Sequence, residues 1–470
     1  MSHSRALVRS LGLGFVVMFV IANIIGSGVY KKVAPMAAEL HSASWVLLAW
    51  LVAGVVTMLG ALSNAEVAGL LADTGGEYAY LRKIYNRFFA FMYGWSLLAV
   101  IQTATISSLA YIFAQSLHSI VPLPPMLTHW QEVSLGGLFF PFSDFSIKAV
   151  AIVLILLLTG LNILGLRGGA MLSRVILVMV VIGLALMVAF GWRSAPPSSG
   201  ATWGIGDLAS HPVTFSAFFT AMLAAFWAYQ GWVSVGFIGG EVKDARRTLP
   251  KGIVVGVLAV IVVYLLVNAA YLRVLTVPQL EQVHASGNRI AAIEVMRFLG
   301  GEAGVWFISV LILLTTLGCT HASVLTGARP YYAMAGDRLF FPAIGRLNRA
   351  QVPGNALLWQ GLWASVLVVS GTFDQLTDMI VFAVFIFYGA TTLGVFILRH
   401  RMPQAHRPYR VWGYPVVPAL FVLFCGVLFV NTIVARPREA FMGLTLMLSG
   451  VPVYFWMRRR RWASKDERRL

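Results

Sequence analysis

The chain alternates between long apolar segments and short polar connections along its whole length. An apolar stretch of about 17 to 25 residues with few charges is typical of a membrane-spanning helix. The pattern therefore predicts an all-α membrane protein with twelve transmembrane helices. The predicted spans are residues 11–33, 43–70, 88–119, 147–166, 171–192, 213–238, 252–274, 304–328, 355–371, 378–398, 415–434 and 440–457.

The first span is interrupted near its middle depth by Gly26, Ser27 and Gly28. Glycine weakens a helix, and unwound backbone at that depth survives only where it lines a cavity or meets a ligand. Free N–H groups at the start of the second half-helix favour an anion, and free C=O groups at the end of the first favour a cation. An amino acid zwitterion carries both charges. The alternative interpretation is that the glycines only permit close helix packing.

The sixth span is also interrupted by glycine, at Gly231, Gly236, Gly239 and Gly240. When the first ten spans are divided into two sets of five, the first and sixth spans correspond. Broken helices at matching positions of two halves are typical of inverted-repeat transporters, which bind their substrate between the breaks. The pair of breaks therefore favours a binding site over packing alone.

Composition agrees with a polytopic membrane protein, because 59% of the 470 residues are hydrophobic and only 11% are charged. The net charge of +17 does not indicate nucleic-acid binding, since the charges lie between the spans. Of the 35 lysines and arginines, 26 lie at the termini and in the even-numbered connections. The positive-inside rule then predicts cytoplasmic termini, with Arg246 and Arg338 inside and Lys148 and Arg193 outside. We expect no cleaved signal peptide, so the first span is retained.

The sequence does not indicate an enzyme. Cys319 and Cys425 lie in apolar spans, where we expect neither a disulfide nor a metal ligand. Histidines and acidic residues are scattered within the spans, whereas an intramembrane active site would need them at one depth. We therefore expect no catalytic residues, no metal site and no cofactor. No Asn-x-Ser/Thr sequon occurs, which fits a bacterial membrane.

Five stretches resemble one transporter family, in order and over nearly the whole chain. They are ALSNAEVAGLLADTGGEYAYL (61–81), FWAYQGWVSVGFIGGEVKDARRTLPKGI (226–253), TTLGCTHASVLTGARPYYAMAGDRLFFPAIGRLN (315–348), RPYRVWGYPVVP (407–418) and GVPVYF (450–455). As a set they are similar to the amino acid–polyamine–organocation superfamily, and within it to the L-type amino acid transporter branch. The resemblance implies a five-plus-five inverted repeat with broken helices 1 and 6 and two added helices. Residues 1–192 and 193–398 would be the repeats, and residues 399–470 would hold helices 11 and 12 and a basic cytoplasmic tail, all in one membrane domain.

The resemblance also implies roles for the first break. Gly26, Ser27 and Gly28 match the family's carboxylate-binding segment, and Ile24 matches a position whose carbonyl receives the substrate amino group. We expect a bulky side chain at position 28 to restrict the backbone and to fill space that the substrate needs. Trp227 matches the aromatic residue that closes over the substrate from outside. Its alternative is a packed or interfacial tryptophan.

Tyr229, Gln230 and Gly231, followed by Trp232, match the second break. Gln230 would hydrogen-bond the substrate or only satisfy unwound backbone, and both interpretations stay open. His321 matches a site-facing position in the eighth span, where it would carry a proton or contact the substrate. The alternative for His321 is a neutral histidine satisfied by its neighbours.

Other polar residues within the spans have two interpretations each. Gln102, Thr103 and Thr105 give the third span a polar face, which would line the cavity or pack between helices. Glu66 lies near the cytoplasmic end of the second span, away from the breaks. There it is expected to pair with a cytoplasmic arginine, in a structural or gating role, rather than to bind substrate.

Two features depart from the family. Many members carry a lysine within the fifth span, where this chain has Val180, which puts in question a coupling mechanism that needs the lysine. Animal members have a cysteine between spans 3 and 4 that bonds a glycoprotein subunit. Residues 120–146 contain no cysteine, so we expect no such disulfide-linked partner.

The function that these features predict is sodium-independent transport of neutral α-amino acids, with exchange by alternating access and aromatic gating by Trp227. The alternative is proton-coupled uptake by a symporter. A sensor built on a transporter fold would be favoured by long tails, which are not found here. The expected location is the bacterial inner membrane, with both termini in the cytoplasm.

Overall fold

A computed structural model describes residues 11–71, 76–133, 140–165, 169–193, 204–233, 242–287, 289–407 and 409–466. In these parts of the chain the regular elements are all helices, and one isolated bridge pairs Leu11 with Val242. The all-helical fold class is confirmed. The chain divides into two compact units, which interleave along the sequence.

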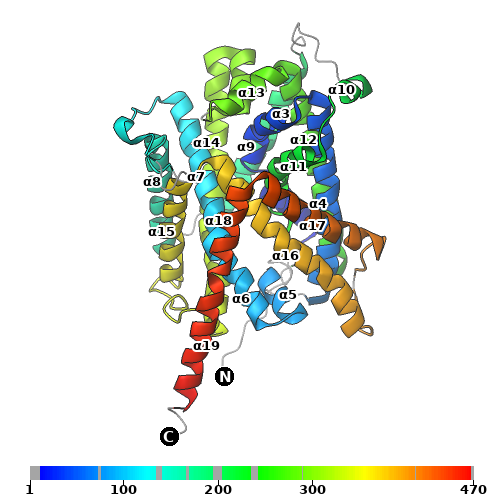
Figure 1. The fold of residues 1–470 in the computed structure, drawn as a ribbon, viewed down its shortest axis with the longest axis vertical. Helices are drawn as coiled ribbons and strands as arrows, with labels where there is room; N and C mark the ends of the chain where they lie inside the picture. The colour runs from blue at the N-terminus through cyan, green and yellow to red at the C-terminus, as the bar shows by residue number, and fades with distance from the viewer. Residues whose placement is uncertain are drawn as a thin grey trace. The chain divides into compact units, whose positions relative to one another are not determined.

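Unit 1 comprises Met1–Asn86, Ala195–Glu281 and Phe385–Asn431. Its helices, several of them labelled in Figure 1, are α1 (Leu13–Ile24), α2 (Gly28–Lys31), α3 (Val33–Leu40), α4 (Ala43–Leu71), α5 (Gly76–Ile84), α10 (Ile205–Ser210), α11 (Phe215–Tyr229), α12 (Ala245–Val274) and most of α17 (Val416–Ala435). Within this unit α12 packs along both α1 and α4, and α11 packs along α3 and α4. The first predicted break therefore separates α1 from α2, and the second follows α11.

Unit 2 comprises Arg87–Ser194, Gln282–Val384 and Thr432–Leu470. Its helices are α6 (Arg87–Ser96), the π-helix η1 (Leu97–Ile101), α7 (Gln102–Ile120), the 3₁₀ helix η2 (Thr128–Trp130), α8 (Phe145–Ile163), α9 (Gly169–Arg193), α14 (Ala291–Gly336), α15 (Gly354–Ser370), α18 (Pro437–Leu448) and α19 (Gly450–Asp466). Gly301, with φ +56°, divides α14 into two helices. Two further helices, α13 (Val277–Ala285) and α16 (Phe373–Arg401), cross the division between the units.

Eight helices among the described residues are long and apolar enough to cross a membrane. They are Ala43–Leu71, Arg87–Ile120, Phe145–Ile163, Arg247–Val274, Ala291–Gly336, Phe373–Arg401, Val416–Ala435 and Pro437–Arg459. Three apolar stretches are shorter, Leu13–Ile24, Val178–Arg193 and Phe215–Tyr229. Two of these, α1 and α11, are short because they end at the predicted breaks. The multi-pass membrane protein is confirmed, while the twelve-helix count stays a prediction.

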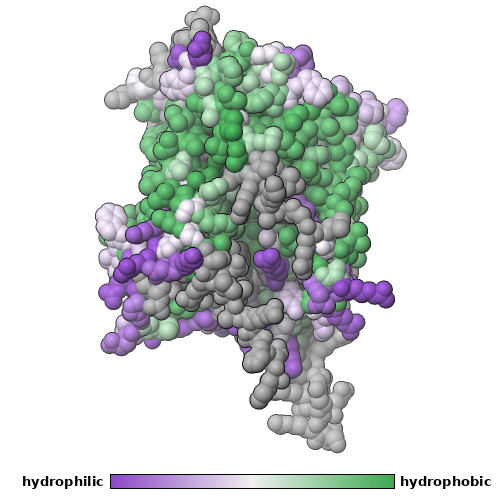
Figure 2. Space-filling view, turned by 180° about the vertical axis from the view of Figure 1, so that it is seen from behind, coloured by the Kyte–Doolittle hydropathy of each residue, from purple (hydrophilic) through white to green (hydrophobic). Residues whose placement is uncertain are grey.

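Large apolar side chains are exposed along the long helices, as expected of surfaces that contact lipid. Val153 and Leu157 of α8 are 62% and 55% exposed. Trp359 and Val366 of α15 are 61% and 52% exposed. Figure 2 shows hydrophobic side chains gathered over broad areas of one face. A soluble protein does not expose apolar surface on this scale.

Candidate functional site

The two predicted breaks lie against each other within unit 1. A Cβ atom built on Gly28, the first residue of α2, would lie 2.6 Å from the Cα atom of Ala228 in α11. Gly231 follows α11 with φ +116°, and a Cβ atom there would collide with the carbonyl oxygen of Asn23 near the end of α1. Only glycine allows both approaches, because each would bring a side chain onto the partner's backbone.

Tyr264 of α12 links the ends of α1 and α11. Its hydroxyl lies 3.0 Å from the Ile24 carbonyl oxygen and 2.8 Å from the Ala228 carbonyl oxygen. A hydroxyl has one proton, so it donates to one of these oxygens at a time. A carbonyl oxygen has two lone pairs, so Ile24 can accept a further donor. Sequence reasoning missed Tyr264, although Tyr264, Asn268 and Tyr271 recur on one face of an otherwise apolar helix.

The first break leaves backbone N–H groups outside the helix ladder. The N–H of Ile25 still donates to the Ile21 carbonyl, and this bond closes the last turn of α1. The N–H of Lys32 donates to the Gly28 carbonyl in the next half-helix. Within the described residues, Gly26, Ser27 and Gly28 donate no backbone hydrogen bond. Ser27, which precedes α2, is 1% exposed and caps nothing with its side chain. Buried N–H groups at a helix start attract an anion.

Trp227 contacts the first break directly. Its indole Nε1 donates a hydrogen bond to Ser27 Oγ at 3.3 Å, and the residue is 7% exposed. The structure therefore brings together Trp227 and Ser27, which were predicted to belong to one site. The hydrogen bond occupies the serine hydroxyl as an acceptor and leaves the backbone N–H of Ser27 uninvolved.

Tyr229 points toward α4 rather than into the break. Its hydroxyl donates to the Trp50 carbonyl oxygen at 3.2 Å, and the side chain is 1% exposed. The rings of Trp50, Tyr229 and Tyr264 have centroids 5.0 to 5.8 Å apart. Tyr229 therefore belongs to an aromatic cluster that packs next to the breaks.

The part of α16 within unit 1 lies along the end of α11. The Tyr388 hydroxyl lies next to the Gln230 side chain, and the Tyr388 ring centroid is 4.8 Å from that of Trp232. One turn earlier, the Phe385 ring packs against Phe226, with ring centroids 4.6 Å apart and ring planes tilted by 54°. These contacts give Gln230 a protein partner, which supports the interpretation that it helps to hold the unwound segment.

His321 lies on α14 in unit 2, where it is partly exposed. Close by, Gln102 Nε2 donates to the Ser323 carbonyl oxygen at 2.8 Å. The Thr103 and Thr105 hydroxyls bond carbonyl groups of their own turn, as α7 begins after the π-helix. The polar face of the third span therefore serves packing and local hydrogen bonding. His321 as a substrate contact stays a prediction.

Among the described residues, no three His, Cys, Asp or Glu side chains are grouped to hold a metal ion. Gly236, Gly239 and Gly240 lie outside the described residues. Val180 is 2% exposed and therefore buried.

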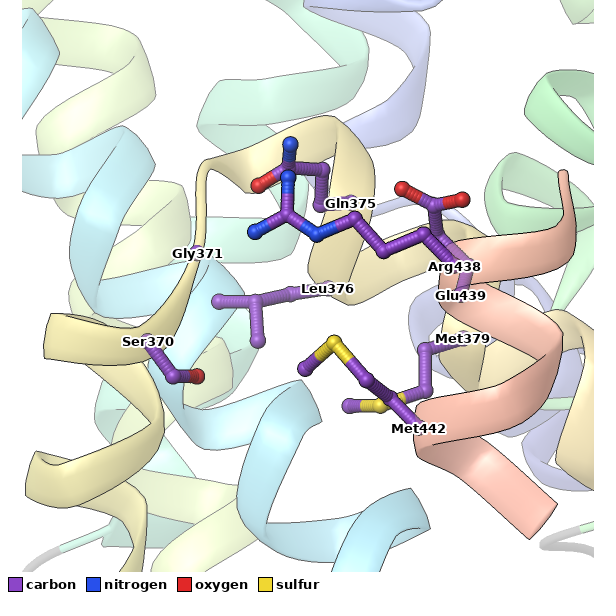
Figure 3. A pocket seen from close by; sticks show the side chains of 8 residues that line it. All are labelled: Ser370, Gly371, Gln375, Leu376, Met379, Arg438, Glu439 and Met442. Atoms are coloured by element: carbon purple, nitrogen blue, oxygen red, sulfur yellow. The ribbon is translucent and has the colours of Figure 1, made fainter. Parts of the chain in front are cut away.

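A small pocket in unit 2 lies between the α15–α16 connection and α18 (Figure 3). Leu376, Met379 and Met442 form its apolar floor, and Figure 3 shows the Arg438 side chain extending toward Gln375. None of the predicted site residues lines it, and its apolar floor is too small a surface to argue for a substrate.

Comparisons with known proteins identify the family. The family model for amino acid permeases matches residues 11–457. The chain is 28% identical over 465 residues to the Bacillus subtilis serine/threonine exchanger SteT, covering 98% of this chain and 99% of SteT. It is 25% identical over 473 residues to the human b(0,+)-type amino acid transporter 1, covering 96% of this chain and 88% of that protein. It is also 25% identical over 461 residues to the human large neutral amino acids transporter small subunit 2, covering 96% and 80%. The expectation of a transporter rather than an enzyme is confirmed, and the chain belongs to the amino acid permease family, in the L-type branch of the amino acid–polyamine–organocation superfamily.

Proposed function

We propose that this protein exchanges neutral α-amino acids across a bacterial inner membrane, independently of sodium. The observation that carries the proposal is the contact between the two breaks, Gly28 against Ala228 and Gly231 against Asn23. It sets the N–H groups of the first break, and the Ile24 carbonyl that can accept a further donor, against the end of α11 within unit 1. A zwitterion requires that pair of charges, whatever its side chain.

In this proposal the substrate carboxylate accepts hydrogen bonds from the backbone N–H groups of Ser27 and Gly28. The substrate amino group donates to the Ile24 carbonyl, which keeps a lone pair beside Tyr264. Hydrogen bonds to a charged group contribute about 1.5–3 kcal/mol each. The backbone thus reads the shared part of every α-amino acid.

Trp227 is the proposed occluding residue. Its hydrogen bond to Ser27 holds the indole beside the carboxylate position, so arrival of a substrate changes the surroundings of both groups. Tyr229 and Gly231 act by shaping the break, and Gln230 acts together with Tyr388. His321 remains a proposed substrate contact.

The proposed architecture is twelve spans with repeats at residues 1–192 and 193–398, followed by residues 399–470, and with both termini in the cytoplasm. Exchange is favoured over proton-coupled uptake because the bacterial relative is named an exchanger. One human relative is named a small subunit. Because residues 120–146 hold no cysteine, we propose that this chain works without a disulfide-linked subunit.

Counterflow into proteoliposomes tests the proposal. Labelled L-serine and L-leucine are presented, in turn, to vesicles preloaded with each neutral amino acid. We expect uptake only into preloaded vesicles, and the same uptake when choline replaces sodium. Uptake into empty vesicles that follows an inward pH gradient would instead establish the proton-coupled symporter.

A competitor without a carboxylate tests the mode of binding. The amide of a transported amino acid keeps the amino group and side chain but presents no negative charge to the Ser27 and Gly28 N–H groups. We expect it to compete about tenfold less well than its parent, or worse. Equal competition would overturn the carboxylate assignment.

A further inference from the structure

Glu66 lies near the C-terminal end of α4, in a buried cluster of charged side chains. The Glu66 side chain is 3% exposed. Its carboxylate accepts two hydrogen bonds from the Arg399 guanidinium, from Nε to Oε1 at 2.9 Å and from Nη2 to Oε2 at 2.7 Å. Arg407 Nε lies 3.4 Å from Oε1, and the backbone N–H of Val411 donates to Oε2 at 2.7 Å. A bidentate arginine fixes orientation as well as distance. The Arg399 guanidinium also lies over the Tyr414 ring, 3.7 Å from its centroid.

The cluster anchors the end of α16 and the connection that follows it. Arg407 Nη2 donates to the carbonyl oxygen of Leu398 in the last turn of α16 at 2.8 Å, and to that of Met402 just after the helix at 3.0 Å. Arg401 Nη1 donates to the carbonyl of Ile84, the last residue of α5, at 2.7 Å. The same elements carry a cluster of buried hydrophobic residues. They are Val67, Ala68, Leu71, Tyr80, Ile84, Val395, Leu398, Val411 and Val417.

The same stretch of α16 carries the residues that contact the α11 break. Tyr388 lies next to Gln230, and the Phe385 ring packs against Phe226 at a tilt of 54°. Arg399 lies eleven positions after Tyr388, which is about 16 Å along a helix. Between them the Tyr85 hydroxyl donates to the Ala390 carbonyl at 2.8 Å, and Thr391 donates to Glu77 at 3.4 Å. A helix is stiff over this length, so its anchored end sets the position of Phe385 and Tyr388.

We propose that Glu66 is a positioning residue for substrate selection. It holds the end of α16 through Arg399, and α16 in turn sets the aromatic wall of Phe385 and Tyr388 beside Gln230. Glu66 touches no substrate and acts through the helix. This inference rests on the proposed function, because the wall selects a substrate side chain only if the substrate binds at the breaks.

The physical argument distinguishes this role from simple stabilisation. A simple stabilising pair, once broken, reduces the amount of folded protein and affects all substrates alike. An anchor that sets the rotation and axial position of α16 changes the space for the side chain. It therefore changes affinity for bulky substrates more than for small ones. The selectivity ratio separates the two roles.

The experiment compares Glu66→Gln and Arg399→Gln with the matched control Arg410→Gln. Arg410 lies in the same connection but is exposed. KM and Vmax are measured by counterflow for L-alanine and for the bulkiest neutral amino acid that the wild type transports, up to L-phenylalanine. We expect the ratio of the two KM values to change by about threefold or more in both cluster variants, as for coupled neighbours. Arg410→Gln should keep the wild-type ratio.

An unchanged ratio with lower Vmax in both cluster variants would overturn the positioning role, and so would an equal change in Arg410→Gln. If Glu66→Gln does not reach the membrane, Arg399→Lys is measured instead, since it keeps the charge but cannot make the two-armed bond. It should shift the ratio in the same direction. A wild-type protein that transports none of these amino acids would instead refute the proposed function, and the positioning role with it.

Discussion

Position 28 requires glycine because the backbone of a second helix, α11, lies against it. This requirement does not involve the substrate. A Cβ atom there would meet both Cα and Cβ of Ala228 at 2.6 Å, and main-chain atoms cannot move aside as a flexible side chain does. The sequence left two reasons for the glycines open, substrate binding at the break and close packing of helices. The contact with Ala228 accounts for Gly28 within the protein itself.

Alanine at positions 27 and 28 should therefore behave differently. Gly28→Ala forces α2 away from α11, at a cost of about 1–3 kcal/mol, and should lower both thermal stability and transport. Ser27→Ala keeps the backbone N–H and loses only the bond from Trp227. It should transport within a few-fold of wild type. Melting temperature in detergent and counterflow measure the two effects. Wild-type stability in Gly28→Ala would mean that the two helices are not in tight contact.

Trp227 should be needed both as a surface and as a donor. Trp227→Ala removes the occluding ring, and transport should fall by about tenfold or more while the protein still reaches the membrane. Trp227→Phe keeps a ring but lacks Nε1, so its transport should be intermediate. Counterflow normalised to surface protein measures both variants. Near wild-type kinetics in Trp227→Ala would rule out the gate.

At the scale of elements, the Asp207 carboxylate is one of the groups that join α10 to the start of α4. Asp207 accepts hydrogen bonds from Ser42 Oγ at 2.7 Å and from the Ser44 N–H at 2.9 Å. Ser42 Oγ in turn accepts from the Trp45 N–H, which caps the helix start. Burial acts to raise the pKa of Asp207, but the bonds from Ser42 and Ser44 and the nearby His211 outweigh it, so the pKa lies below its ordinary value.

This junction should weaken in acid. A carboxyl whose pKa is lower in the folded state stabilises fully above its unfolded pKa of about 3.9, and the contribution is lost as pH falls through the folded value. Asp207→Asn should therefore lower stability by about 0.5–2 kcal/mol at pH 7, and the gap to wild type should close at lower pH. Melting temperature against pH measures this, with the exposed Asp244→Asn as control. A gap that stays constant down to pH 2 would contradict the assignment.

At the scale of the whole molecule, the distribution of positive charge predicts the orientation in the membrane. Arg193 and Arg338 are exposed and suit cysteine labelling. Lys148 is also predicted to face outside, but it is 1% exposed and donates to the Phe140 carbonyl at 2.7 Å. Position 148 is therefore unsuitable for cysteine labelling. In a chain without Cys319 and Cys425, we expect an impermeant maleimide to label Arg193→Cys in intact cells and to spare Arg338→Cys. The opposite pattern would invert the topology.

Hydropathy alone predicted most of the helices, because a membrane helix satisfies the hydrogen-bonding groups of its own backbone. Each long apolar run therefore indicates one element without knowledge of its neighbours. Glycine content likewise indicated where α1 and α11 end, since a helix weakens locally at Gly26, Gly28 and Gly231. Glu66 was expected to pair with an arginine, because a charge within an apolar span needs a partner. The pairing with Arg399 agrees with that expectation.

The sequence by itself determined the helical class, the positions of the breaks and the residues that carry polar chemistry. Only the tertiary structure decided which of them meet. Glu66 pairs with an arginine 333 positions away, and Trp227 bonds a serine 200 positions away. Tyr264 lies on a polar face of α12, and only the structure shows that it joins the ends of both broken helices. Periodicity records which face of a helix is polar, whereas the partner of that face depends on side-chain packing between helices, which no local pattern contains.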